Sequence, residues 1–116
     1  MKLVRAYTGK DEESHLDVMD HSDLEYVERD GTRTAIQTAT GTQFAIRSEG
    51  AFTDFHNAPR RQYVFYLTAS VELGLGDGST HLMEPGDVLL AEDTTGRGHT
   101  SRVVKGGISA TVRLDP

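Results

Sequence analysis

The chain of 116 residues contains no cysteine, only three prolines and no long apolar run. Without cysteine it can form no disulfide, no thiolate metal site and no cysteine nucleophile, which is typical of a reducing compartment. No stretch approaches the ~20 apolar residues that span a bilayer. The N-terminus turns polar at Thr8, short of the about 7–15 apolar residues that a signal peptide needs. We therefore expect a cytoplasmic protein with no membrane contact.

Basic residues are also scarce, because 12 lysines and arginines stand against 18 acidic residues and give a formal net charge of −6. An acidic domain lacks the positive surface that holds a phosphate backbone, so nucleic acid is not an expected partner. The phosphate-binding GxxxxGK[ST] motif, the dinucleotide GxGxxG motif and the GxSxG nucleophile motif are absent. The remaining candidate partner is a small molecule.

The sequence is rich in short alternating segments separated by glycine. Glycine and proline predict turns at 76–79 and 84–87, and a further turn at Gly41. No helical crossover is apparent, and the length fits one domain, 1–116. The pattern predicts an all-β fold, a barrel or a sandwich, with strands over 33–38, 43–48, 61–68, 70–75, 88–91, 99–104 and 108–114.

Residues 14–28 depart from this pattern, because they are acidic and their apolar residues are irregularly spaced. This predicts a loop with at most one helical turn, followed by a strand over 24–28. We expect the barrel core to span about 24–114. The N-terminal segment, 1–23, would pack on that core or on a partner chain.

Two histidines stand beside strands that could enclose a site. His56 precedes the most strand-like segment of the chain, and His99 opens a later strand. Alternate residues of a strand share a face, so Gln62, Val64 and Tyr66 would face the interior with His56. Histidine titrates near neutral pH and suits proton transfer. For the two histidines, metal ligation, acid–base chemistry and purely structural hydrogen bonding all remain open. Gln62 could be a metal ligand or could form a hydrogen bond with the neighbouring loop. Tyr66 could be a catalytic acid or a residue of the hydrophobic core.

The segment from His56 through Glu72, with Pro85-Gly86-Asp87 and His99, resembles the two-part motif of the cupin superfamily. That motif has the forms G-x5-H-x-H-x3,4-E-x6-G and G-x5-P-x-G-x2-H-x3-N. Here His56 matches the first histidine, and His99 matches the histidine of the second part after a longer loop. Ala58 stands at the second histidine position, and Gln62 replaces the glutamate. The resemblance covers residues 33 to 114.

The resemblance implies a single-domain double-stranded β-helix, the jelly-roll barrel of small cupins. It also implies a metal site, reduced here to His56, Gln62 and His99. These neutral ligands would hold one divalent transition metal (Fe, Zn, Ni, Cu or Mn) only weakly. Dimerisation through a barrel face is implied too, and the opposite strand face with Tyr63 and Phe65 is the candidate for a homodimer.

Four arginines near these segments are candidates for binding an anionic ligand, because guanidinium binds carboxylates through two parallel hydrogen bonds. They are Arg47, Arg60, Arg61 and Arg102. By contrast, Asp93 is expected to form a turn by accepting backbone N–H groups.

These observations favour an enzyme that acts on a small organic molecule inside the barrel, with His56, His99 and Tyr66 as catalytic residues. Isomerisation, cyclisation or decarboxylation would need no metal, whereas oxygenase chemistry would. The alternative is a non-catalytic protein that binds or senses a small molecule. A third possibility is a structural domain with a filled interior.

Overall fold

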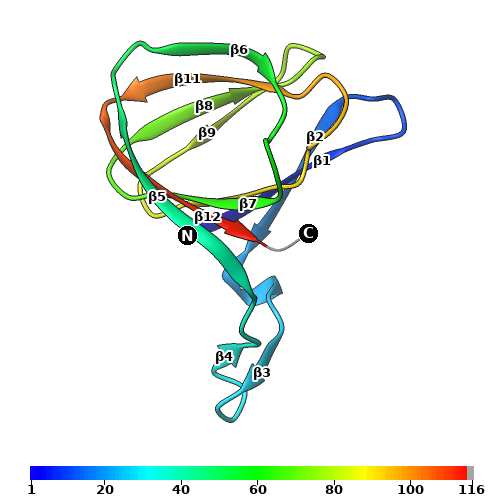
Figure 1. Cartoon of the computed structure of the whole chain (residues 1–116), viewed down its shortest axis with the longest axis vertical. Coiled ribbons are helices and arrows are strands. Elements are labelled where there is room, and N and C mark those ends of the chain that lie inside the picture. Colours follow the sequence, from blue (N-terminus) through cyan, green and yellow to red (C-terminus); the bar gives the residue numbers. More distant parts are fainter. Residues whose placement is uncertain (115–116) are drawn as a thin grey trace.

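The computed structural model describes residues 1–114 and consists almost entirely of β-strands (Figure 1). The larger sheet has the order β2 (Ser14–Asp20), β1 (Lys2–Thr8), β10 (Val88–Ala91), β7 (Gln62–Tyr66), β12 (Gly107–Leu114) and β5 (Ala39–Arg47). The smaller sheet has the order β6 (Phe52–His56), β11 (His99–Lys105), β8 (Ser70–Gly74) and β9 (Thr80–Met83). The all-β prediction is confirmed.

A third, two-stranded sheet of β3 (Tyr26–Glu28) and β4 (Arg33–Thr34) projects away from the two larger sheets (Figure 1). It follows a single 3-10 turn over His21–Asp23, the only helical segment in residues 1–114. Accordingly, no helix in this part of the chain is long and apolar enough to cross a bilayer.

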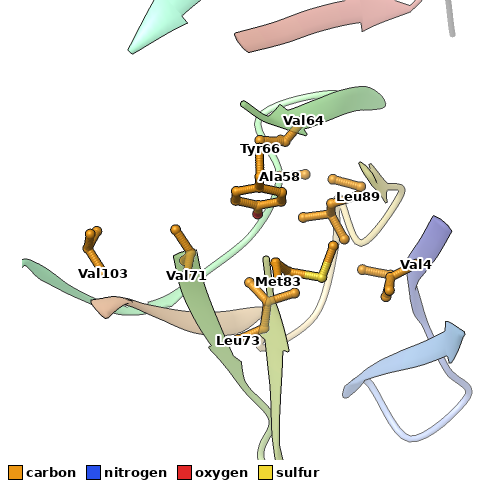
Figure 2. Close-up of a cluster of buried hydrophobic side chains, with 11 residues drawn as sticks. Val4, Ala58, Val64, Tyr66, Val71, Leu73, Met83, Leu89 and Val103 are labelled. Atoms are coloured by element: carbon orange, nitrogen blue, oxygen red, sulfur yellow. The ribbon is translucent and has the colours of Figure 1, made fainter. Parts of the chain in front are cut away.

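The hydrophobic core lies between the two larger sheets. Val4, Val64 and Leu89 come from the six-stranded sheet, and Leu73 and Met83 come from the four-stranded sheet. Figure 2 shows these side chains meeting in the space between the sheets. Burial of this apolar surface is the main favourable contribution to folding.

The N-terminal segment differs from the prediction, because residues 2–20 form two strands of the larger sheet. β1 pairs in parallel with β10, from Leu3↔Val88 to Ala6↔Ala91, and β2 pairs with β1. The expected loop over 14–20 is thus strand β2. As an edge strand with one neighbour, β2 retains the exposed acidic residues that suggested a loop. The predicted core boundary at 24 was wrong for the same reason.

The predicted turn at Gly41 was also wrong, because Gly41 lies within β5. That strand, Ala39–Arg47, pairs with β12 along its length except for one irregularity beside Gly41, and this extended ladder overrides the local tendency of glycine to break a strand. The other two turns are confirmed. Gly78 N–H donates to the Leu75 carbonyl, and Asp87 N–H donates to the Glu84 carbonyl.

Candidate functional site

A cavity of about 90 Å³ lies between the two larger sheets. Side chains from β5, β7 and β10 line it on one side, and side chains from β6, β8 and β11 line it on the other. The lining residues that sequence analysis singled out are His56, His99, Gln62, Tyr66 and Arg47.

The two histidines lie directly against each other. His56 at the end of β6 and His99 at the start of β11 are paired residues in the ladder, and their ring centroids are 4.7 Å apart. The rings are tilted by 57°. Antiparallel pairing thus brings together two imidazoles that are separated by more than forty positions in the sequence.

His99 is buried and bonded to a carboxylate that lies deeper still. Its Nδ1 lies 2.5 Å from Oδ2 of Asp93, and the Ser14 hydroxyl donates to the same oxygen at 2.7 Å. Asp93 is completely buried, and its Oδ1 has no hydrogen-bond partner among the described residues. The bond to Asp93 leaves Nε2 as the free nitrogen of the His99 ring.

Asp93 is held in its anionic form despite this burial. Burial by itself raises the pKa of a carboxyl group. Here the hydrogen bond and charge of His99, with the hydrogen bond from Ser14, outweigh it and hold the pKa of Asp93 below its ordinary value. The prediction that Asp93 merely forms a turn was therefore wrong, since its side chain orients His99.

The His56 ring is also held by a hydrogen bond at Nδ1. Its Nδ1 lies 2.8 Å from the backbone carbonyl oxygen of Asp54 and must donate to it, because a carbonyl only accepts. The free nitrogen of His56 is therefore also Nε2. Both rings thus have the tautomer that a metal ligand or a general base requires.

The residues that could hold a metal ion are His56, His99 and Gln62, which line the same cavity. The described residues contain no cluster of three histidine, cysteine or acidic side chains placed to hold a metal. The three neutral donors therefore fit a divalent cation only weakly, since no ligand charge offsets that of the ion.

Tyr66 projects from β7 into the space between the sheets (Figure 2). Its side chain is almost completely buried, and burial raises the pKa of its hydroxyl to about 12, with a smaller opposing effect from Arg47. Tyr66 therefore stays protonated near neutral pH and can donate a hydrogen bond from its hydroxyl. As predicted from alternation, Gln62 and Val64 line the cavity with it.

Of the four predicted arginines, only Arg47 lines this cavity, where its Nε donates to the buried Ser109 hydroxyl at 2.9 Å. Arg61 pairs instead with Glu92, and the Arg102 guanidinium lies over the ring of Phe52. Arg60 lines a separate hollow. Adjacent residues on a strand point to opposite faces, so Arg61 turns away from Gln62.

Sequence reasoning missed Asp93 and Ser14, although one signal for Asp93 was present. Asp93 lies two residues past the buried strand β10 and six residues before His99, with a glycine-containing loop between them. A carboxylate just after a buried strand can accept a hydrogen bond from a histidine that follows a short loop. The sequence around Ser14 gives no such signal, because Ser14 comes close to Asp93 only when β2 is in place in the folded sheet.

Comparison with known proteins adds no family assignment: no protein-family model and no curated protein matches the chain.

Proposed function

We propose that this chain is a small cupin-type enzyme that moves a proton on a small organic molecule in the cavity between its sheets. The observation that carries the proposal is the buried pair of His99 and anionic Asp93. A second imidazole and a guanidinium, from His56 and Arg47, line the same cavity. Two facing sheets with an enclosed histidine pair also support the jelly-roll interpretation.

His99 is the proposed general base. Its Nδ1–H donates to Asp93, so the Nε2 lone pair can accept a proton from a carbon next to a carbonyl group. The carboxylate of Asp93 stabilises the imidazolium that forms and keeps the ring in position. Return of the proton to another atom or face of the substrate gives an isomer and regenerates His99. The cycle consumes no redox equivalent.

Arg47 and Tyr66 supply the complementary charge. Removal of a proton next to a carbonyl places negative charge on the carbonyl oxygen, and preorganised donors stabilise it. The Arg47 guanidinium is always charged, and the Tyr66 hydroxyl stays protonated because burial raises its pKa to about 12. His56, against His99, can accept the proton from the His99 imidazolium at its free Nε2 and pass it back to the substrate, which leaves both rings neutral.

His56, His99 and Gln62 are also the residues that would hold a divalent cation. When bound, such an ion would polarise a substrate oxygen. A metal ion and a substrate proton would bind the same Nε2 lone pair of His99, so metal binding and general-base catalysis would compete. In the acid–base proposal, added Zn²⁺ inhibits the reaction at micromolar to millimolar concentration; activation by a metal would favour the metal-dependent alternative.

The proposal is tested without a known substrate by deuterium exchange. Small keto acids and hydroxy acids that stabilise the protein are first selected by thermal shift, which follows mass action. Each is then incubated with the protein in D₂O, and ¹H NMR records loss of carbon-bound protons. His99→Gln should lower the exchange rate by about 10²–10⁴-fold, the usual contribution of general acid–base catalysis.

His21→Gln is the matched control, because His21 is exposed in the 3-10 turn outside the site. It should exchange at the wild-type rate, and circular dichroism should show both variants folded. A ligand that binds tightly but never exchanges, in wild type or variant, would favour the non-catalytic binding protein.

A further inference from the structure

A second hollow, of about 300 Å³, lies beside the strand ends of β5 and β12. The two arginines that line it are Arg60, just before β7, and Arg113, near the end of β12. Thr40, Gly41, Thr42, Gln43 and Thr111 complete the lining. Of these, Gln43 and Thr111 have side chains on the same face of the sheet as Arg113, and both side chains can donate hydrogen bonds.

This hollow lies on the same sheet face as the histidine cavity. In the ladder between β12 and β7, Thr111 is paired with Val64 and Arg113 with Gln62. Directly paired residues of antiparallel strands project to the same side. Since Val64 and Gln62 line the cavity, Thr111 and Arg113 continue its lining toward one end of the sheet.

The next strand extends the same face. Gln43 on β5 is paired with Thr111, and Gly41 is paired with Arg113. The hollow thus lies on the strands next to the cavity, with Arg113 paired with Gln62.

No carboxylate among residues 1–114 engages the two arginines, because none lies within 4 Å of the guanidinium of Arg60 or Arg113. By contrast, Arg5, Arg61 and Arg97 form ion pairs. In a chain of net charge −6, two cations that line one groove without such a partner in residues 1–114 favour the binding of an oxyanion.

The cavity is small. At about 90 Å³ it is smaller than the ~150 Å³ cavity that admits a benzene molecule in another protein. A substrate of more than a few atoms would therefore extend out of the cavity, and Arg113 of the groove is paired with Gln62 of the cavity lining.

We propose that this arginine groove binds the anionic end, a carboxylate or a phosphate, of an elongated substrate whose reactive end lies at His56 and His99. The inference rests on the proposed function for the reactive end. It adds a substrate class: a short chain with a carbonyl group at one end and an oxyanion at the other.

The first test measures anion binding directly. Arginine Nε–Hε signals are followed by ¹⁵N NMR while glutarate, inorganic phosphate or chloride is added at constant ionic strength. Saturable shifts should be confined to Arg60 and Arg113, with millimolar Kd. Tighter binding of glutarate would identify a carboxylate site, and tighter binding of phosphate a phosphate site. Shifts that rise linearly with all three anions would overturn the proposal.

Variants separate the groove from general surface charge. Combining Arg60→Gln with Arg113→Gln should weaken anion binding at least tenfold, whereas Arg33→Gln on the exposed strand β4 should leave Kd within twofold. Gly41→Leu provides a test that keeps both charges. A Cβ at Gly41 meets no atom within 4 Å, so a leucine there has open space at its base and should weaken anion binding by occupying the groove. Equal binding by all variants would contradict the site.

A kinetic test links the groove to the substrate. For any compound that exchanges deuterium, Arg113→Gln should raise KM at least fivefold and leave kcat within twofold, because it holds the end remote from the reaction. His99→Gln should abolish exchange and retain glutarate binding. If the wild-type protein exchanges deuterium but does not bind glutarate, only the groove proposal is rejected. If it binds glutarate but exchanges no deuterium, only the proposed function is rejected.

Discussion

Gly98 allows the histidine pair to form. It has φ +82°, a backbone conformation that side chains rarely adopt, and it directly precedes His99. A Cβ at this position would overlap the backbone carbonyl group of His56 and approach the backbone nitrogen of Asn57. The close approach of the 96–99 loop to the end of β6 therefore depends on a residue without a side chain.

Gly98→Ala should destabilise the protein and separate the two imidazoles. Gly78→Ala is the matched control, since Gly78 has φ +86° but a Cβ there meets no atom within 4 Å. The control should lose about 1–2 kcal/mol from backbone strain alone. Gly98→Ala should lose at least about 2 kcal/mol more, because backbone atoms must also move. Urea denaturation measures both; equal losses would show that the contact with His56 is unimportant.

At the scale of the elements, the N-terminal part of the chain contains two very different segments. Strand β1 lies between β2 and β10, and its Val4 and Ala6 are completely buried. The segment 21–38 with the projecting β3–β4 hairpin has no buried residue. Apart from the local hydrogen bonds between Asp20 and residues 21–23, the hydrogen bond to the larger sheet that involves side chains among the described residues joins Tyr63 to Gln37.

Replacement of residues 25–37 by a flexible linker should therefore lower Tm by less than about 5 °C, the shift expected from about 1 kcal/mol in a domain of this size. Removal of residues 1–8 should abolish cooperative unfolding, because β2 loses the one strand with which it pairs in the described sheet and β10 loses one of its two neighbours. Calorimetry distinguishes the two variants. A large loss of Tm in the linker variant would show that the hairpin is covered by another chain.

At the scale of the whole molecule, the outer face of the larger sheet carries exposed apolar side chains toward its β5 edge. On the edge strand β5, Phe44 is 73% exposed and Ile46 is 83% exposed. Phe44 is paired with Ala110, which is paired with Phe65, so these side chains share the face opposite the cavity. The ring of Tyr63 lies 5.7 Å from that of Phe65. Such patches commonly mark interfaces.

The homodimer that the cupin resemblance implied stays a prediction, and this face is its proposed contact. Light scattering after gel filtration should give twice the mass of the chain. Phe44→Asp combined with Ile46→Asp should yield a folded monomer. Val104→Asp, at a 48% exposed site on the other sheet, should remain dimeric. A monomeric wild-type protein would contradict the prediction.

Local chemistry in the sequence was enough to determine several features. Alternation over 62–66 decided which side chains face the cavity, because neighbouring residues of a strand must project to opposite sides. Glycine and proline decided the turns at 75–79 and 84–87, because these residues restrict or extend φ locally. The histidines could be selected as candidates because their residue type suits proton transfer.

Only the tertiary structure decided which distant groups meet. Ser14 and Asp93 are separated by 79 positions, yet share a buried hydrogen bond, and β1 pairs with β10 across a similar span. It also selected Arg47 over Arg61 for the cavity. The pairing of strands that are far apart in the sequence cannot be predicted from the residue pattern of either strand, because it depends on the shape and register of the whole sheet.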